Sequence, residues 1–87
     1  MDVDKNLVFT WVLAAVETYS QANGTFPAVE LHQDRVRQDG DWFYVSVARK
    51  PPYSARSFPF FDQLRDIEDK LQEEHSVNVL LVPTIAA

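Results

Sequence analysis

Cationic and aromatic side chains gather in the middle of this 87-residue sequence, and they are its best candidates for a binding surface. In a hairpin closed at Asp39-Gly40, strand alternation places Arg37 across from Trp42 and Arg35 near Tyr44. Interleaved cations and rings can pair with phosphates and stack on bases, and the same residue types anchor protein interfaces. We therefore predict a contact surface made of Arg35, Arg37, Trp42, Tyr44, Arg49, Tyr53 and Arg56.

The charge of the chain favours a protein partner over nucleic acid. The formal net charge is −5, and residues 1–34 and 66–87 each carry one Lys against five acids. Only residues 35–65 are basic, with six cations against three acids. Because an acidic protein is repelled by phosphate, this basic segment can act only locally. A non-catalytic interaction or regulatory module is therefore our main prediction, and a single-stranded RNA-binding module that uses the Arg/aromatic hairpin is the alternative.

Few residues have the types and spacing that a reaction needs. There is no cysteine, and the only histidines, His32 and His75, lie in different predicted elements. A metal site needs three or four converging ligands, and His32 has only Asp34 nearby on its strand face. The acidic residues between 62 and 74 belong to the solvated face of a predicted helix, where burial cannot raise a pKa into the working range. We expect no enzymatic activity, no metal and no cofactor.

Residues 42–83 resemble the second half of the small nucleotidyltransferase domains. The resemblance lies in the strand Val45–Val47, a Pro-rich loop, a helix rich in Leu and Glu (61–74) and an apolar strand (77–83). That family holds its metals with carboxylates at positions that correspond here to Trp42, Tyr44 and Leu80. The resemblance therefore implies a degenerate domain without catalytic carboxylates. The predicted element order is also similar to that of KH-type RNA modules, although the sequence has no Gly-x-x-Gly loop.

The N-terminal half predicts a helix followed by a hairpin. Apolar residues recur every three or four positions from about Asp4 to Ala22. Asp2 and Asp4 can cap the start of this helix, and Asn23-Gly24 can end it, with glycine in the left-handed conformation. Strands are predicted at 28–37 and 42–49. The alternation slips between Gln33 and Val36, which predicts a bulge or exposed end and a place for the first strand at the sheet edge.

The C-terminal half predicts a β-α-β unit. The Pro-rich joint at 50–59 ends the second strand and offers Ser57 as a helix cap, with Pro59 in the first turn. A helix is predicted from about Phe60 to His75 and a strand over Val77–Val82, parallel to the strand before the helix. Because this last strand is apolar on both sides, we expect both of its faces to be covered.

Together these elements predict an α+β fold in one domain, residues 1–87. Its architecture is a two-layer α-β-β-α-β arrangement with a three-stranded mixed sheet and two helices. If both helices cover the same face, Trp42, Tyr44 and part of the last strand form an exposed apolar patch, which is typical of a partner surface. We therefore expect a homodimer that packs sheet on sheet or edge to edge, or an unidentified protein partner. The alternative is that the first helix covers this face.

The N-terminus does not resemble an export or membrane signal. Its first residues are acidic where a secretory peptide would be basic. The apolar run from Leu7 to Val16 is too short to span a bilayer. These observations favour a cytoplasmic protein with no membrane partner.

Overall fold

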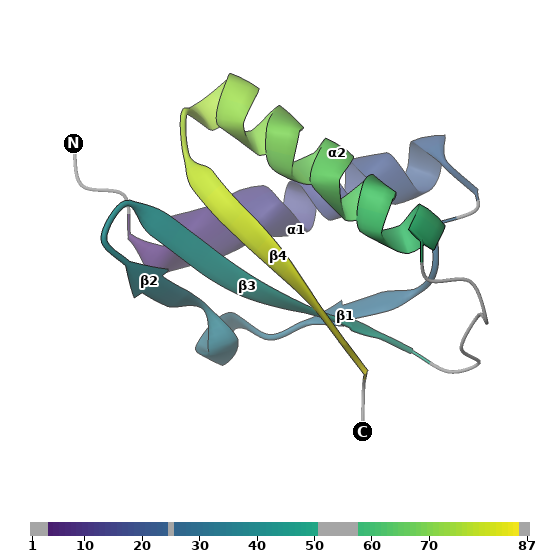
Figure 1. Ribbon diagram of the computed structural model, residues 1–87, viewed down its shortest axis with the longest axis horizontal. Helices are drawn as coiled ribbons and strands as arrows, with labels where there is room; N and C mark the ends of the chain where they lie inside the picture. Colours follow the sequence, from purple (N-terminus) through teal and green to yellow (C-terminus); the bar gives the residue numbers. More distant parts are fainter. Residues whose placement is uncertain (1–3, 25, 51–57, 86–87) are drawn as a thin grey trace.

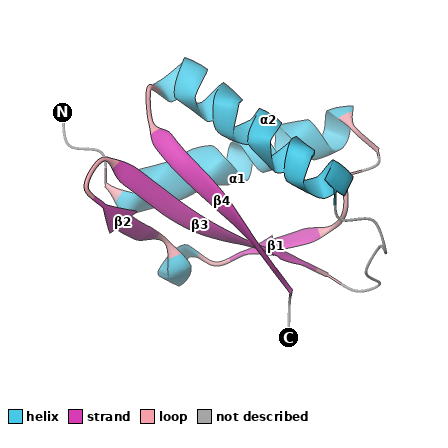
Figure 2. Cartoon of the chain, viewed as in Figure 1, coloured by secondary structure: helices cyan, strands magenta, loops and turns pink. Residues whose placement is uncertain are grey.

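The chain folds as a layer of two helices on a mixed sheet (Figures 1 and 2). The computed structural model describes residues 4–24, 26–50 and 58–85. Within these residues the elements are α1 (Lys5–Ala22), β1 (Val29–Leu31), a 3-10 turn (Gln33–Arg35), β2 (Arg37–Asp39), β3 (Trp42–Arg49), α2 (Phe58–His75) and β4 (Asn78–Ile85). The predicted α+β class is confirmed, but the sheet has four strands where the sequence predicts three.

The extra strand arises because the predicted first strand is interrupted. β1 and β2 both pair antiparallel with β3, and the 3-10 turn between them breaks the ladder. This turn lies within the segment where the sequence alternation slips, so the predicted irregularity is confirmed. The edge position is confirmed as well, because β1 and β2 pair only with β3 among the described strands.

The hairpin register differs from the prediction. Asp39 pairs with Trp42 and Arg37 with Tyr44, so the turn contains only Gly40 and Asp41. Gly40 has φ +61°, a conformation that glycine adopts without steric cost. Glycine at the first position of a two-residue turn is the type II′ pattern, which matches the twist of the two strands. The predicted pairing of Arg37 with Trp42 is therefore wrong, because the turn is shorter than the sequence suggests.

Local capping explains where α1 begins and ends. The Asp4 carboxylate accepts the Leu7 N–H at 2.8 Å, which confirms one predicted cap, whereas Asp2 lies outside the described residues. At the other end the Asn23 N–H and side-chain amide both donate to the Tyr19 carbonyl. Asn23 is in the extended region (φ −129°) and Gly24 does not have a positive φ. The predicted left-handed glycine at this helix end is therefore wrong.

The β-α-β unit forms as predicted: β3 has the predicted bounds, α2 begins at Phe58 instead of Phe60, and β4 extends to Ile85 instead of Val82. β3 and β4 pair in parallel along their whole length, from Trp42 and Asn78 to Arg49 and Ile85. α2 includes Pro59 in its first turn, while the predicted cap Ser57 lies outside the described residues. The helix ends at His75, and Ser76 after it has φ +53° and donates its N–H to the Gln72 carbonyl.

Both helices lie on the same face of the sheet (Figure 1). The core between the layers is one cluster of buried side chains: Val8, Val12, Val16, Phe26, Val36, Phe43, Val45, Val47, Phe60, Leu64, Ile67, Leu71, Val77, Val79 and Leu81. Alternate residues of the strands point into this core, as strand alternation requires: Phe43, Val45 and Val47 of β3 and Val79 and Leu81 of β4. Neither described helix is long and apolar enough to cross a membrane.

Candidate functional site

The face of the sheet that lies opposite the helices carries the candidate site. We call this surface the open face. It is formed by Arg37, Asp39, Trp42, Tyr44, Ser46, Asn78, Leu80 and Val82. Cross-strand partners share a face, so the register orders these side chains into rows across the sheet. One row runs from Arg37 through Tyr44 to Leu80, and the next runs from Asp39 through Trp42 to Asn78.

Large apolar side chains on the open face reach solvent. Trp42 is 47% exposed and Leu80 is 42% exposed. Tyr44 and Val82 are half-buried beside them. The prediction that the last strand is covered on both faces is therefore wrong. Both helices occupy the opposite layer, so the apolar residues of β4 that alternate with its core residues have no helix above them.

A hollow of about 720 Å³ lies at the edge of the open face, beside the turn between β1 and β2. Arg37, Tyr44, Ser46 and Val82 line it from the strands, and Asp34 and Arg35 line it from the turn, with Gln38 and Asp39 completing the wall. The hollow thus holds two guanidinium groups and two carboxylates. Among the described residues none of the four belongs to an ion pair. They remain available to pair with charges on another molecule.

The seven predicted contact residues do not all meet at this site. The hollow contains Arg35, Arg37 and Tyr44, and Trp42 lies on the same face one row further along. Arg49 belongs to the opposite face, where its guanidinium lies 5.2 Å from the centre of the Phe60 ring. Its place in the predicted surface is therefore wrong. Tyr53 and Arg56 lie outside the described residues.

The position of Arg49 could have been read from the sequence. Arg49 is in phase with Phe43, Val45 and Val47, the residues that point into the core. Its long side chain can cover the edge of the core while the charged group contacts an aromatic ring. The alternation along the strand therefore predicts the face on which Arg49 lies better than the general preference of arginine for a solvated surface does.

Sequence reasoning missed a contact that protects one edge of the sheet. The Leu81 N–H on β4 donates to the Glu68 carboxylate on α2 at 2.7 Å. Burial raises the pKa of Glu68, and nearby Asp69 adds to this, although the Leu81 hydrogen bond and Arg65 act in the opposite direction. Pro83, two residues further along β4, has no N–H. The outer edge of β4 is thus poorly suited to pair with another strand.

The described residues do not assemble a metal site. No group of three or more His, Asp or Glu side chains lies close enough to hold an ion within the described part of the chain. His32 faces Glu30 at 3.9 Å, and Asp34 lies in the 3-10 turn that lines the hollow. Tyr44 and Leu80, which correspond to carboxylate positions in the nucleotidyltransferase resemblance, are direct neighbours across β3 and β4. Neither residue carries a carboxylate, the side-chain ligand that binds Mg²⁺ at such sites.

Comparisons of the chain with protein families, with curated proteins and with solved structures give no match.

Proposed function

We propose that this protein is a non-catalytic interaction module that self-associates by packing the open face of one copy on the open face of another. The observation that carries the proposal is the exposure of Trp42 and Leu80 on a sheet face that no described helix covers. Exposed apolar groups that adjoin one another are typical of partner surfaces. A stable interface buries about 800 Å² on each partner, roughly an eighth of this chain's surface of 5969 Å².

The charges beside this apolar surface suit a second copy of the same chain. Arg35, Arg37, Asp34 and Asp39 together carry no net charge. In a two-fold symmetric interface each copy meets the same surface, so an arginine of one copy can pair with an aspartate of the other. A strongly basic or acidic surface would repel itself, whereas this mixed surface does not.

The geometry favours contact between faces over contact between the β4 edges. Two β4 strands that paired edge to edge would need the Leu81 N–H, which already donates to Glu68, and would meet Pro83. Sheet-on-sheet packing needs neither backbone group. It places Trp42 and Tyr44, rigid side chains that lose little entropy on binding, at the contact.

Sedimentation velocity over a dilution series tests the proposal. We expect the wild-type protein to change from dimer to monomer between about 1 mM and about 1 μM, a range that covers association free energies of about −4 to −8 kcal/mol. Leu80→Glu should weaken the dimer at least about tenfold, because it buries an unpaired carboxylate. The matched control is Leu13→Glu on α1, where the leucine is 40% exposed on the helix layer, and this variant should dimerise like the wild type. A wild-type protein that stays monomeric throughout, or equal effects of the two variants, would refute the proposal.

Single-stranded RNA binding is the rival function, supported by the cross-strand neighbours Arg37 and Tyr44 in the hollow. The two aspartates that line the same hollow count against RNA binding, because they offset the positive potential that phosphate requires. Titration of labelled single-stranded RNA at low salt separates the two functions. Tight binding that falls steeply as salt rises, and that Arg37→Gln reduces, would favour the rival. The cytoplasmic location remains a prediction from the sequence.

A further inference from the structure

The two edges of the sheet differ in how they can meet another chain. On the β4 edge the Leu81 N–H is occupied by Glu68 and Pro83 has no N–H to offer. The opposite edge is formed by β1 and β2. An unprotected edge strand can pair with an added strand. Whether β1 can do so depends on whether its outward N–H and C=O groups are already hydrogen-bonded.

Backbone groups of β1 point away from the sheet. The Lys50 N–H donates to the Ala28 carbonyl at 3.0 Å. In an antiparallel pair, residues alternate between those that bond the neighbouring strand and those that point away from it. Ala28 and Glu30 therefore face β3, and Val29 and Leu31 direct their N–H and C=O groups to the free edge. Within the described part of the chain no other residue bonds these groups.

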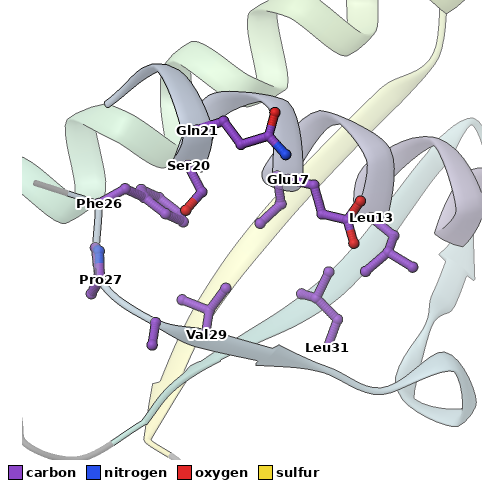
Figure 3. Close-up of a pocket in the computed structure, with 10 residues that line it drawn as sticks. Leu13, Glu17, Ser20, Gln21, Phe26, Pro27, Val29 and Leu31 are labelled. Atoms are coloured by element: carbon purple, nitrogen blue, oxygen red, sulfur yellow. The ribbon is translucent and has the colours of Figure 1, made fainter. Parts of the chain in front are cut away.

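A groove of about 540 Å³ runs along the same edge, between α1 and β1 (Figure 3). The side chains of Val29 and Leu31 point from β1 toward α1, and Leu13 points from α1 toward Leu31 (Figure 3). Phe26 closes the end of the groove near the C-terminus of α1. A strand laid beside β1 would direct every second side chain into this groove, where Leu13, Val29 and Leu31 offer apolar contacts.

Among the described residues that line the groove, Glu17 is the only acidic or basic one, with the polar Ser20 and Gln21 beside it on α1. A basic residue on the bound segment would complement Glu17. A second copy of this chain is a poorer occupant. If two copies paired through their β1 strands, each would bring its own Glu17 to the shared edge, and like charges repel.

We infer that β1 binds an extended peptide segment as an added strand, with alternate apolar side chains in the α1–β1 groove and a basic residue facing Glu17. The partner is a peptide or an unstructured protein segment of this pattern. The inference is independent of the proposed self-association, which uses the other face of the sheet.

A displayed library of random peptides of about nine residues, longer than a typical strand, tests this inference. The library is selected on the wild-type protein and counter-selected on Leu13→Glu. We expect enriched peptides with alternating apolar residues and at least one Lys or Arg. Synthetic copies should bind Leu13→Glu at least about tenfold more weakly, equivalent to 1.4 kcal/mol. Leu80→Glu is the matched control, and it should bind them as the wild type does although its self-association is impaired.

Two further measurements examine the mode of binding. Methylation of the peptide nitrogens that face β1 should abolish binding, and the amide resonances of Val29 and Leu31 should shift when the unmethylated peptide is added. Glu17→Lys should reverse the charge preference, so that peptides with Glu in place of the basic residue bind better than the originals. The inference is overturned if no peptide is enriched, if binding survives methylation or Leu13→Glu, or if the Val29 and Leu31 amides shift with protein concentration alone.

Discussion

Variants of Glu68 separate two contributions to the stability of the fold: the hydrogen bond that Glu68 accepts from Leu81, and the charge of its carboxylate. The carboxylate is half-buried and accepts the Leu81 N–H at 2.7 Å. We compare Glu68→Gln, which keeps an oxygen acceptor but removes the charge, with Glu68→Ala, which removes both. The matched control is Glu73→Gln, an exposed glutamate on the same helix.

The expected changes in unfolding free energy follow from the lost hydrogen bond and from the change in helix propensity. Loss of the acceptor should cost about 1 kcal/mol of unfolding free energy. The better helix propensity of alanine returns a few tenths of this. Glu68→Ala should therefore lower the melting temperature by about 4 °C, the low end expected for a domain of this size. Glu68→Gln retains the hydrogen bond and avoids burial of a charge, so at pH 7 it should be at least as stable as the wild type.

The sign of the pH dependence follows from the raised pKa of Glu68, whose largest cause is burial. A carboxyl whose pKa is higher in the folded than in the unfolded state adds stability while it is protonated. That contribution is fully present below the unfolded pKa, about 4.3. It is lost as pH rises through the folded value. The stability of the wild type relative to Glu68→Gln should therefore fall between acid and neutral pH.

Urea unfolding followed by circular dichroism across this pH range measures the three variants. Glu73→Gln should change the unfolding free energy by less than about 0.5 kcal/mol. If Glu68→Gln is as destabilising as Glu68→Ala at pH 7, the charge itself stabilises the fold, and the reasoning from burial is refuted.

Two other substitutions test the backbone strain after α2 and a hydrogen bond between α1 and α2. Ser76→Gly should raise the unfolding free energy by about 0.5–1 kcal/mol, because glycine relieves the strain of φ +53° at the end of α2; a loss of stability in urea titrations would contradict this. Tyr19→Phe removes the hydrogen bond from the Tyr19 hydroxyl to Asp66 (3.1 Å), which joins α1 to α2, and should lower the unfolding free energy by about 0.5 kcal/mol. Because burial and the neighbouring Asp66 raise the pKa of Tyr19, the tyrosine's contribution is present below its ordinary pKa of 10 and is lost as pH rises through the folded value. The difference between Tyr19→Phe and the wild type should thus disappear in strongly alkaline solution, and a difference that persists there would count against the contact.

The structure also locates two surfaces that different partners could use. The open face presents apolar side chains beside balanced charges, whereas the β1 edge presents backbone groups beside a groove lined by apolar residues and Glu17. The first suits a folded surface, and the second suits an extended segment. The variants Leu80→Glu and Leu13→Glu address the two surfaces separately, because these leucines are similarly exposed on opposite layers.

Patterns close in sequence determine the elements of this protein. Apolar spacing and the Asp4 cap predict α1, and the alternation of Phe43, Val45 and Val47 predicts β3. The slip after Gln33 predicts the break between β1 and β2. These features depend on interactions between residues a few positions apart, and the sequence displays such neighbours directly.

The proposed contact surfaces depend on how the elements pack, which only the tertiary structure decides. The apolar residues of β4 are compatible with cover on both faces, and Leu80 is exposed because both helices lie on the other side. A turn shorter than expected places Arg37 beside Tyr44 instead of Trp42. Glu68 on α2 accepts the N–H of Leu81 on β4. In each case the outcome depends on contacts between distant segments, and local periodicity carries no information about which distant segments will meet.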